Sequence, residues 1–210
     1  ARRWMFRSRR PGRELAWLPY AVRAGRRIIK QDSIDIIFGT CPPFSDALIG
    51  ACLRILTGKR LVLDFRDDWI QTPWYYSKPF PIRAIESLME RWAVSLADRV
   101  ILVTEWSRKA FIARYPSQPA EKFIFIPNGC DLKDFEAAQA MEAPSNPKFR
   151  IIHAGSLNDS KLWARNPRGF FQAVCRILEK QPLADRISLE FAGDFTDNHR
   201  AMAKEMGLAN

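Results

Sequence analysis

The sequence of 210 residues contains little of what disulfide scaffolds and metal centres require. It has two histidines, and its four cysteines stand far apart without any C-x-x-C pair. A disulfide framework needs densely and regularly spaced cysteines, and a structural zinc site needs four clustered ligands. We therefore expect Cys41, Cys52, Cys130 and Cys175 to be reduced thiols in a cytoplasmic protein, and we expect no zinc site.

Long apolar runs are also missing. No stretch approaches the roughly 20 apolar residues that a membrane-spanning helix needs. The opening ARRWMFRSRRPGR is basic, but it lacks the apolar centre of a signal peptide. We expect a protein that neither spans a membrane nor is exported, and whose first residues form a surface end.

The sequence does have enough apolar residues for a core, together with an excess of positive charge. Hydrophobic residues make up 47% of the chain and aromatic residues 12%, so a globular fold is expected. Lys and Arg number 33 against 23 Asp and Glu, which gives a net charge of +10. This excess favours an anionic partner such as nucleic acid, anionic lipid or a phosphorylated small molecule, without choosing among them.

Apolar strands and amphipathic helices alternate from the start of the chain. Apolar runs predict buried strands at 34–40, 60–65, 99–104 and 122–127, and periodic patterns predict helices at 17–30, 45–58, 82–96 and 105–114. Ser45 is the candidate N-cap of the second helix, and Gly58 ends it. The third helix carries one apolar stripe, Ile85, Leu88, Met89, Trp92 and Leu96. Buried strands joined by helices predict a parallel sheet covered on both faces, which is a doubly wound α/β domain.

A second α/β unit follows a linker. Residues 137–148, AAQAMEAPSNPK, have linker composition, and strands at 150–155 and 187–194 then alternate with helices at 167–180 and 197–206. We place one domain at 1–145, with the linker from about 137, and a second at 146–210. Two parallel strands bury their faces poorly, so we expect the second domain to be incomplete. The first domain opens on a helix, so we expect it to lack its first strands.

Polar residues gather where the predicted strands end. Ligands of open parallel sheets bind outside these carboxyl ends, so the side chains there are candidate site residues: Thr40, Arg66, Asp67, Trp69, Asn128, Gly129, His153, Gly155 and Ser156. Alternatives stay open at each. The charged cluster in LVLDFRDDW (61–69) also fits internal pairing or capping of the next helix, and Asn128–Gly129 fits a simple turn. His153 also fits a buried imidazole, and Trp69 an aromatic lid packed on the core.

Taken together, four phrases resemble a known family. IPNGCDLKDF (126–135) has the form that closes the N-terminal domain of the retaining GT-B glycosyltransferases of family 4, also called group 1. AGSL (154–157) resembles the end of the strand that opens their C-terminal domain, and LADRVILVTEWSRKAF (96–111) resembles another family segment. LVLDFRDDW matches the D-x-R-D-x-W loop of one subgroup. The resemblance covers nearly all of residues 34–210 and implies two Rossmann-like domains.

The resemblance implies transfer of a sugar, with retention, from a nucleotide-diphosphate sugar to a hydroxyl acceptor. The acceptor would be a glycan or lipid-linked saccharide of cell-envelope or polysaccharide biosynthesis, bound by the N-terminal domain. The C-terminal domain would hold the nucleotide sugar. No metal is expected, because basic side chains and a helix N-terminus offset the charge of the leaving diphosphate.

The resemblance also assigns roles to residues. Asp67 and Arg66 are the candidate catalytic residues, and one or the other would face the reacting sugar from the acceptor side. Thr40 and Trp69 would bind substrate nearby, and Asn128, followed by Gly129, would shape the cleft near the hinge. Lys161 or Arg165 would bind the diphosphate, assisted by His153, Gly155 and Ser156. Many relatives carry arginine where Ser156 stands and a lysine followed by glycine near Lys161, so the identity of the diphosphate-binding cation stays open here. The family's paired-glutamate segment would lie beyond Asn210, so this chain is expected to bind nucleotide sugar poorly and to have little or no activity.

Two other functions compete with the transferase. A sugar-nucleotide epimerase of similar fold ranks lower, because the I-P-N-G-x-D phrase belongs to the transferases. A basic binding protein for nucleic acid lacks any helix-turn-helix, zinc-finger or RNA-recognition signature, so we expect no nucleic-acid partner. The arginines of the 17–30 helix, opposite apolar side chains, fit a solvated face and also fit a peripheral position at the inner face of an anionic membrane.

Overall fold

The computed structural model describes residues 15–133, 135–136, 148–157, 165–180 and 186–208. The chain divides into two compact units, Ala1–Cys130 and Asp131–Asn210, and we describe each by itself. The domain boundary predicted near residue 145, with its linker from 137, lies outside the described residues. None of the described helices combines the length and the apolarity needed to cross a bilayer.

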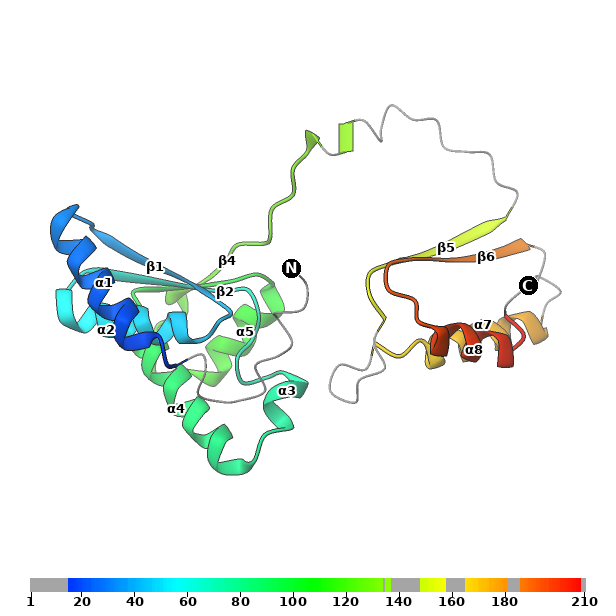
Figure 1. Ribbon diagram of the computed structural model, residues 1–210, viewed down its shortest axis with the longest axis horizontal. Coiled ribbons are helices and arrows are strands. Elements are labelled where there is room, and N and C mark those ends of the chain that lie inside the picture. Colours follow the sequence, from blue (N-terminus) through cyan, green and yellow to red (C-terminus); the bar gives the residue numbers. More distant parts are fainter. Residues whose placement is uncertain (1–14, 134, 137–147, 158–164, 181–185, 209–210) are drawn as a thin grey trace. The chain divides into compact units, whose positions relative to one another are not determined.

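The first unit is a four-stranded parallel sheet in the order β1-β2-β3-β4, with helices between successive strands (Figure 1). Its elements are α1 (Leu18–Gln31), β1 (Ile36–Cys41), α2 (Ser45–Thr57), β2 (Arg60–Phe65), α3 (Pro73–Tyr76), α4 (Phe80–Leu96), β3 (Arg99–Leu102), α5 (Glu105–Arg114), a 3-10 turn (Ala120–Lys122) and β4 (Phe123–Phe125). The predicted alternation is confirmed. The bounds predicted for β2 and α5 are the observed ones to the residue, because strong local signals, such as Gly58 before β2, lie next to these elements.

One face of this sheet forms the core. Alternate side chains of the strands, such as Leu61, Leu63 and Val100, are fully buried beneath the helices. The other alternate set includes Ile36 and Phe38, which are 54% and 59% exposed. The expectation of a sheet covered on both faces is therefore wrong for the described residues, because the successive helices cover the same face.

The start of α2 and the apolar stripe of α4 differ from the sequence expectations. Phe44, not Ser45, is the N-cap of α2; Ser45 is its first helical residue and accepts a hydrogen bond from the Trp17 indole nitrogen at 3.2 Å. In α4 the buried residues are Glu90, Ala93 and Val94. The predicted stripe is split between two environments: Met89 and Leu96 pack on the core, whereas Ile85, Leu88 and Trp92 are exposed.

The phrase LADRV places Asp98 where three elements meet. Its carboxylate accepts the backbone N–H of Leu61 at 2.8 Å and pairs with Arg54 of α2 at 3.3 Å. Asp98 comes after Ala97, the C-cap of α4, so one side chain joins the ends of α2 and α4 to the start of β2. This aspartate has a structural role.

The second unit contains two parallel strands and two described helices. β5 (Phe149–Ala154) pairs with β6 (Ile187–Ala192), and α7 (Arg168–Lys180) and α8 (Asp197–Glu205) supply buried side chains such as Phe171, Val174 and His199. A capping box joins Thr196 to His199 at the start of α8. No residue of β5 or β6 is classed as buried, as expected for a described sheet of two strands.

Candidate functional site

Arg114 holds the loop that follows β2 in place through Asp68. Asp68 accepts two hydrogen bonds from the Arg114 guanidinium, Nη1–Oδ1 at 3.1 Å and Nη2–Oδ2 at 3.0 Å. Arg114 is the last residue of α5, and both side chains are nearly buried. A planar guanidinium can bind a carboxylate through two hydrogen bonds at once. Such a bidentate contact fixes the orientation of the two side chains as well as their distance.

The same guanidinium also pairs with a fully buried carboxylate. Glu90 of α4 is completely enclosed, and its Oε1 accepts Arg114 Nη1 at 2.7 Å together with the hydroxyl of Tyr115. Glu90 Oε2 has no hydrogen-bond partner among the described residues. Burial raises the pKa of Glu90 above its usual range, although the Arg114 charge opposes this shift. One cation thus joins the loop after β2 to α4 within the core.

The far end of the loop is anchored by an aromatic stack. The ring of Trp69 lies parallel to that of Phe44, with centroids 4.9 Å apart and an angle of 4° between planes. Trp69 is 6% exposed and belongs to the core cluster. Its burial agrees with the alternative of packing on the core, and little of its ring is left to meet a sugar.

Between these two anchors, Arg66 and Asp67 are exposed. The backbone N–H of Arg66 donates to the Cys41 carbonyl at 2.9 Å, which carries the β1–β2 pairing one residue past the strand. Neither side chain has a hydrogen bond or ion pair in the part of the chain that the structure describes. The loop therefore presents a free guanidinium and a free carboxylate on a fixed backbone.

Other predicted residues share this edge of the sheet. Thr40 stands opposite Asp64 in the β1–β2 register, and both are half-buried on the face that the helices leave open. Asn128 and Gly129 follow β4 and are exposed. Because carboxyl ends of parallel strands meet at one edge, Thr40, Arg66 and Asp67 lie at the same edge as Asn128.

In the second unit the predicted residues gather at the ends of β5 and β6. The Ser156 hydroxyl lies 2.9 Å from Asp194 Oδ2, and the Gly155 N–H donates to the Ala192 carbonyl at 2.8 Å. A Cβ on Gly193 would lie 2.1 Å from the Gly155 carbonyl oxygen, and Gly193 has φ of +145°, so only glycine fits there. The two strand ends are thus in close backbone contact.

The remaining predicted residues of this unit make fewer polar contacts among the described residues. His153 has its Nε2 buried without a hydrogen-bond partner among the described residues. Arg165 is exposed shortly before α7, and Lys161 lies outside the described residues. In the described chain no group of His, Cys, Asp and Glu is arranged to hold a metal ion.

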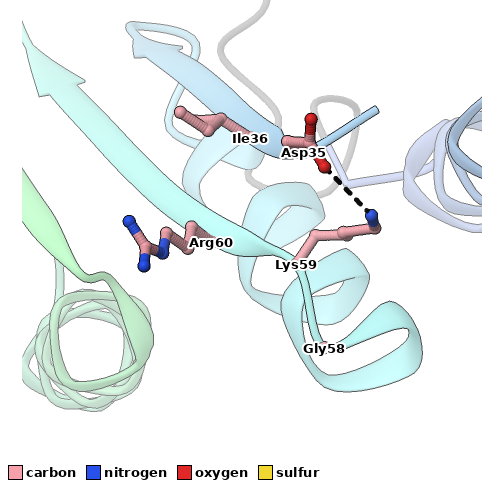
Figure 2. A pocket seen from close by; sticks show the side chains of 5 residues that line it. All are labelled: Asp35, Ile36, Gly58, Lys59 and Arg60. Carbon is pink, nitrogen blue, oxygen red and sulfur yellow. Dashed lines mark hydrogen bonds and ion pairs between the residues drawn. The ribbon is translucent and has the colours of Figure 1, made fainter. Parts of the chain in front are cut away.

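A shallow pocket of about 390 Å³ lies at the opposite edge of the first sheet. Asp35, Ile36, Gly58, Lys59 and Arg60 line it, and Lys59 reaches Asp35 at 3.5 Å (Figure 2). These residues precede or begin β1 and β2, so the pocket is at the amino ends of the strands. None of the predicted site residues lines it.

Sequence reasoning missed the residues beneath the loop. Arg114 is 46 residues from Asp68, and Glu90 is 24 residues from Arg114. The available signal was that Glu90 lies three and four residues before Ala93 and Val94, on the same face of α4, since an acid on a buried helix face needs a partner. The partner itself could not be identified from spacing.

Comparison with known sequences shows the family of the chain. The sequence profile of Glycosyltransferase Family 4 matches residues 3–134, so the chain belongs to this family. A search of curated protein sequences finds no match.

Solved structures are similar to this chain at low sequence identity. A UDP-N-acetylglucosamine 2-epimerase matches at TM-score 0.50 and 12% identity, over 95% of this chain and 48% of that one. The S. aureus MnaA–UDP co-structure matches at 0.48 and 12%, over 94% and 51%, and Anabaena Alr3699/HepE with UDP at 0.46 and 17%, over 89% and 54%. The chain spans about half the length of these proteins, and the likeness concerns the parallel α/β fold alone.

Proposed function

We propose that this chain forms the acceptor side, and the beginning of the donor side, of a retaining glycosyltransferase. The enzyme moves a sugar from a nucleotide-diphosphate sugar to a hydroxyl group of a glycan or lipid-linked saccharide. The observation that carries the proposal is the loop after β2, whose Arg66 and Asp67 are exposed while Asp68 and Trp69 are fixed. Membership of Glycosyltransferase Family 4 supports the class of reaction.

The two free side chains suit this chemistry. When a sugar leaves its diphosphate, positive charge develops at the anomeric carbon and negative charge on the leaving oxygen. A carboxylate at Asp67 can stabilise the first or orient the attacking hydroxyl, and the guanidinium of Arg66 can bind sugar hydroxyls or phosphate oxygens. The fixed backbone avoids the entropy cost of ordering the loop at each turnover.

The donor side is proposed for the ends of β5 and β6. Arg165, and Lys161 by sequence, would contribute positive charge near the start of α7, where a helix N-terminus also favours an anion. Ser156 and the Gly155 backbone would contact the donor from the strand end. The Ser156 hydroxyl contacts Asp194, so this position contributes no positive charge to the proposed donor site.

A product assay tests the proposal. The full-length protein is incubated with isotope-labelled nucleotide sugars and a panel of saccharide acceptors, and products are followed by nuclear magnetic resonance. We expect a nucleoside diphosphate and a glycoside that keeps the anomeric configuration of the donor. A changed sugar still attached to its nucleotide would indicate an epimerase, and an inverted glycoside would contradict retention.

A further inference from the structure

Trp17 contacts the start of α2, although the two lie 28 residues apart in the sequence. Its indole nitrogen donates to the Ser45 hydroxyl at 3.2 Å. Ser45 is the first residue of α2 and is 2% exposed, so the accepting oxygen belongs to the packed part of the first unit. Trp17 is itself the N-cap of α1. The hydrogen bond therefore fixes the orientation of a ring whose backbone is already held by a helix start.

The connection between β1 and α2 contacts the loop after β2 at two points. The backbone N–H of Arg66 donates to the Cys41 carbonyl at 2.9 Å at the start of this connection. At its end, the ring of Phe44 stacks on that of Trp69 with centroids 4.9 Å apart. The residue after Phe44 is the one that Trp17 contacts. Trp17 is thereby placed at the carboxyl edge of β1 and β2, where the candidate loop begins.

Much of the Trp17 ring is open to solvent. Trp17 is 46% exposed, whereas Trp69 is 6% exposed and belongs to the core. In the part of the chain that the structure describes, no aromatic ring or cation packs on the Trp17 indole. A large aromatic side chain that is held in one orientation and left open is typical of a binding surface.

We propose that Trp17 stacks on the apolar face of the acceptor saccharide and helps to select it, an assignment that rests on the proposed function. One face of a pyranose ring presents mainly C–H bonds, whose hydrogens are attracted to the negative face of an indole. The sugar hydroxyls need polar partners, and Arg66 and Asp67 at the same edge have none among the described residues. A lipid chain would leave both charged groups without a partner. An axial hydroxyl interrupts the C–H face, so such a sugar stacks less well.

Acceptor kinetics of the full-length protein test the proposal, with the saccharide that the product assay identifies. Trp17→Ala should raise the KM for the acceptor about tenfold because the stacking contact is lost. The kcat and the KM for the donor should change less than about twofold, as for a contact made equally in the ground and transition states. Trp17→Phe keeps an aromatic ring and should recover most of the affinity. Ser45→Ala removes the hydrogen bond that orients the indole and should raise the acceptor KM about threefold.

Trp92→Ala is the matched control, since Trp92 is 38% exposed and lies near the end of α4, which leads to the amino edge of the sheet. It should leave all three kinetic constants unchanged, and every variant should keep its circular dichroism. An acceptor KM that does not respond to Trp17→Ala overturns the proposal. Equal effects of Trp17→Ala and Trp92→Ala overturn it too, because the loss would then be general.

A binding measurement separates this assignment from the sugar-transfer proposal. Fluorine magnetic resonance of the full-length protein labelled with 5-fluorotryptophan is recorded with lactose, cellobiose and the saccharides of the acceptor panel. Trp17→Phe identifies the Trp17 signal, which should shift with at least one saccharide while the Trp92 signal stays in place. If it shifts and no sugar is transferred, a saccharide site remains and the proposed transferase function is wrong. If it shifts with no saccharide, or only on dilution as for a contact between two copies, the assignment is wrong even where transfer occurs.

Discussion

Arg114 donates two hydrogen bonds, of 3.1 and 3.0 Å, to the Asp68 carboxylate, and its Nη1 also donates to the buried Glu90 carboxylate at 2.7 Å. The loop that carries Arg66 and Asp67 thereby depends on a charge pair inside the core. Removing one member of such a pair leaves the other charge buried without compensation. The network therefore couples the shape of the candidate site to the stability of the first unit.

Replacing Arg114 by methionine should be costly. The change leaves Glu90 enclosed and Asp68 without its partner, so we expect a loss of about 3–5 kcal/mol in the free energy of unfolding. Urea denaturation followed by circular dichroism measures it. Arg108→Met is the matched control, because Arg108 pairs with Glu105 on the partly exposed surface of the same helix and its replacement should cost much less than that of Arg114. Similar losses for both variants would contradict a structural role for the buried pair.

Glu90 should give stability a distinctive pH dependence. Burial raises its pKa in the folded state above the ordinary value of 4.5, so the folded protein holds this proton more tightly than the unfolded chain. The contribution of Glu90 is most favourable below its unfolded pKa and is lost as the pH rises through the folded pKa. Glu90→Gln should remove this dependence.

The comparison is made from unfolding free energies of both proteins between acidic and neutral pH. The stability difference between the original chain and Glu90→Gln should shift in favour of Glu90→Gln as the pH rises. A constant difference, or a shift in the opposite direction, would mean that the pKa of Glu90 is not raised.

How far the sequence predicted this fold depends on the range of each interaction. Apolar runs and local stops placed β2 and α5 to the residue, because these signals lie within the element or beside it. The outward turn of Leu88 could not be foreseen, since periodicity shows that α4 has an apolar stripe but not which side packs on α2 and the sheet. Trp69 was expected to meet substrate or to pack on the core, and its partner Phe44 on the β1–α2 connection decides for packing.

For the candidate site, too, local features could be predicted from the sequence and long-range contacts could not. The rule that ligands bind at carboxyl ends of parallel strands selected Arg66 and Asp67 from sequence, and the structure leaves both exposed at that edge. The contacts that hold them there join residues far apart in the chain, so sequence spacing contains no signal for the Asp68–Arg114 pair.

Gly193→Ala should loosen the second unit. The added Cβ would collide with the Gly155 carbonyl oxygen, and the backbone at φ of +145° is strained for alanine, so a cost of about 1–3 kcal/mol is expected. Hydrogen exchange reports it directly, because the amides of Gly155 and Leu157 donate to Ala192 and Asp194 across this contact. Both amides should exchange faster. Gly129→Ala, whose Cβ would meet nothing within 4 Å, should leave them unchanged; equal exchange in both variants would show that the contact does not close the strand ends.

Kinetics of Asp67→Asn in the full-length protein test the central claim most directly, with Glu121→Gln as the control because Glu121 is an exposed acid in the 3-10 turn before β4. We expect kcat for sugar transfer to fall by about a hundredfold or more, as for loss of a group that acts on the reacting atoms. The free energy of unfolding should change by less than about 0.5 kcal/mol, as for an exposed side chain without partners. If Asp67→Asn loses stability in proportion to activity, or keeps full activity, Asp67 is a structural residue of the loop and the proposed catalytic role is wrong.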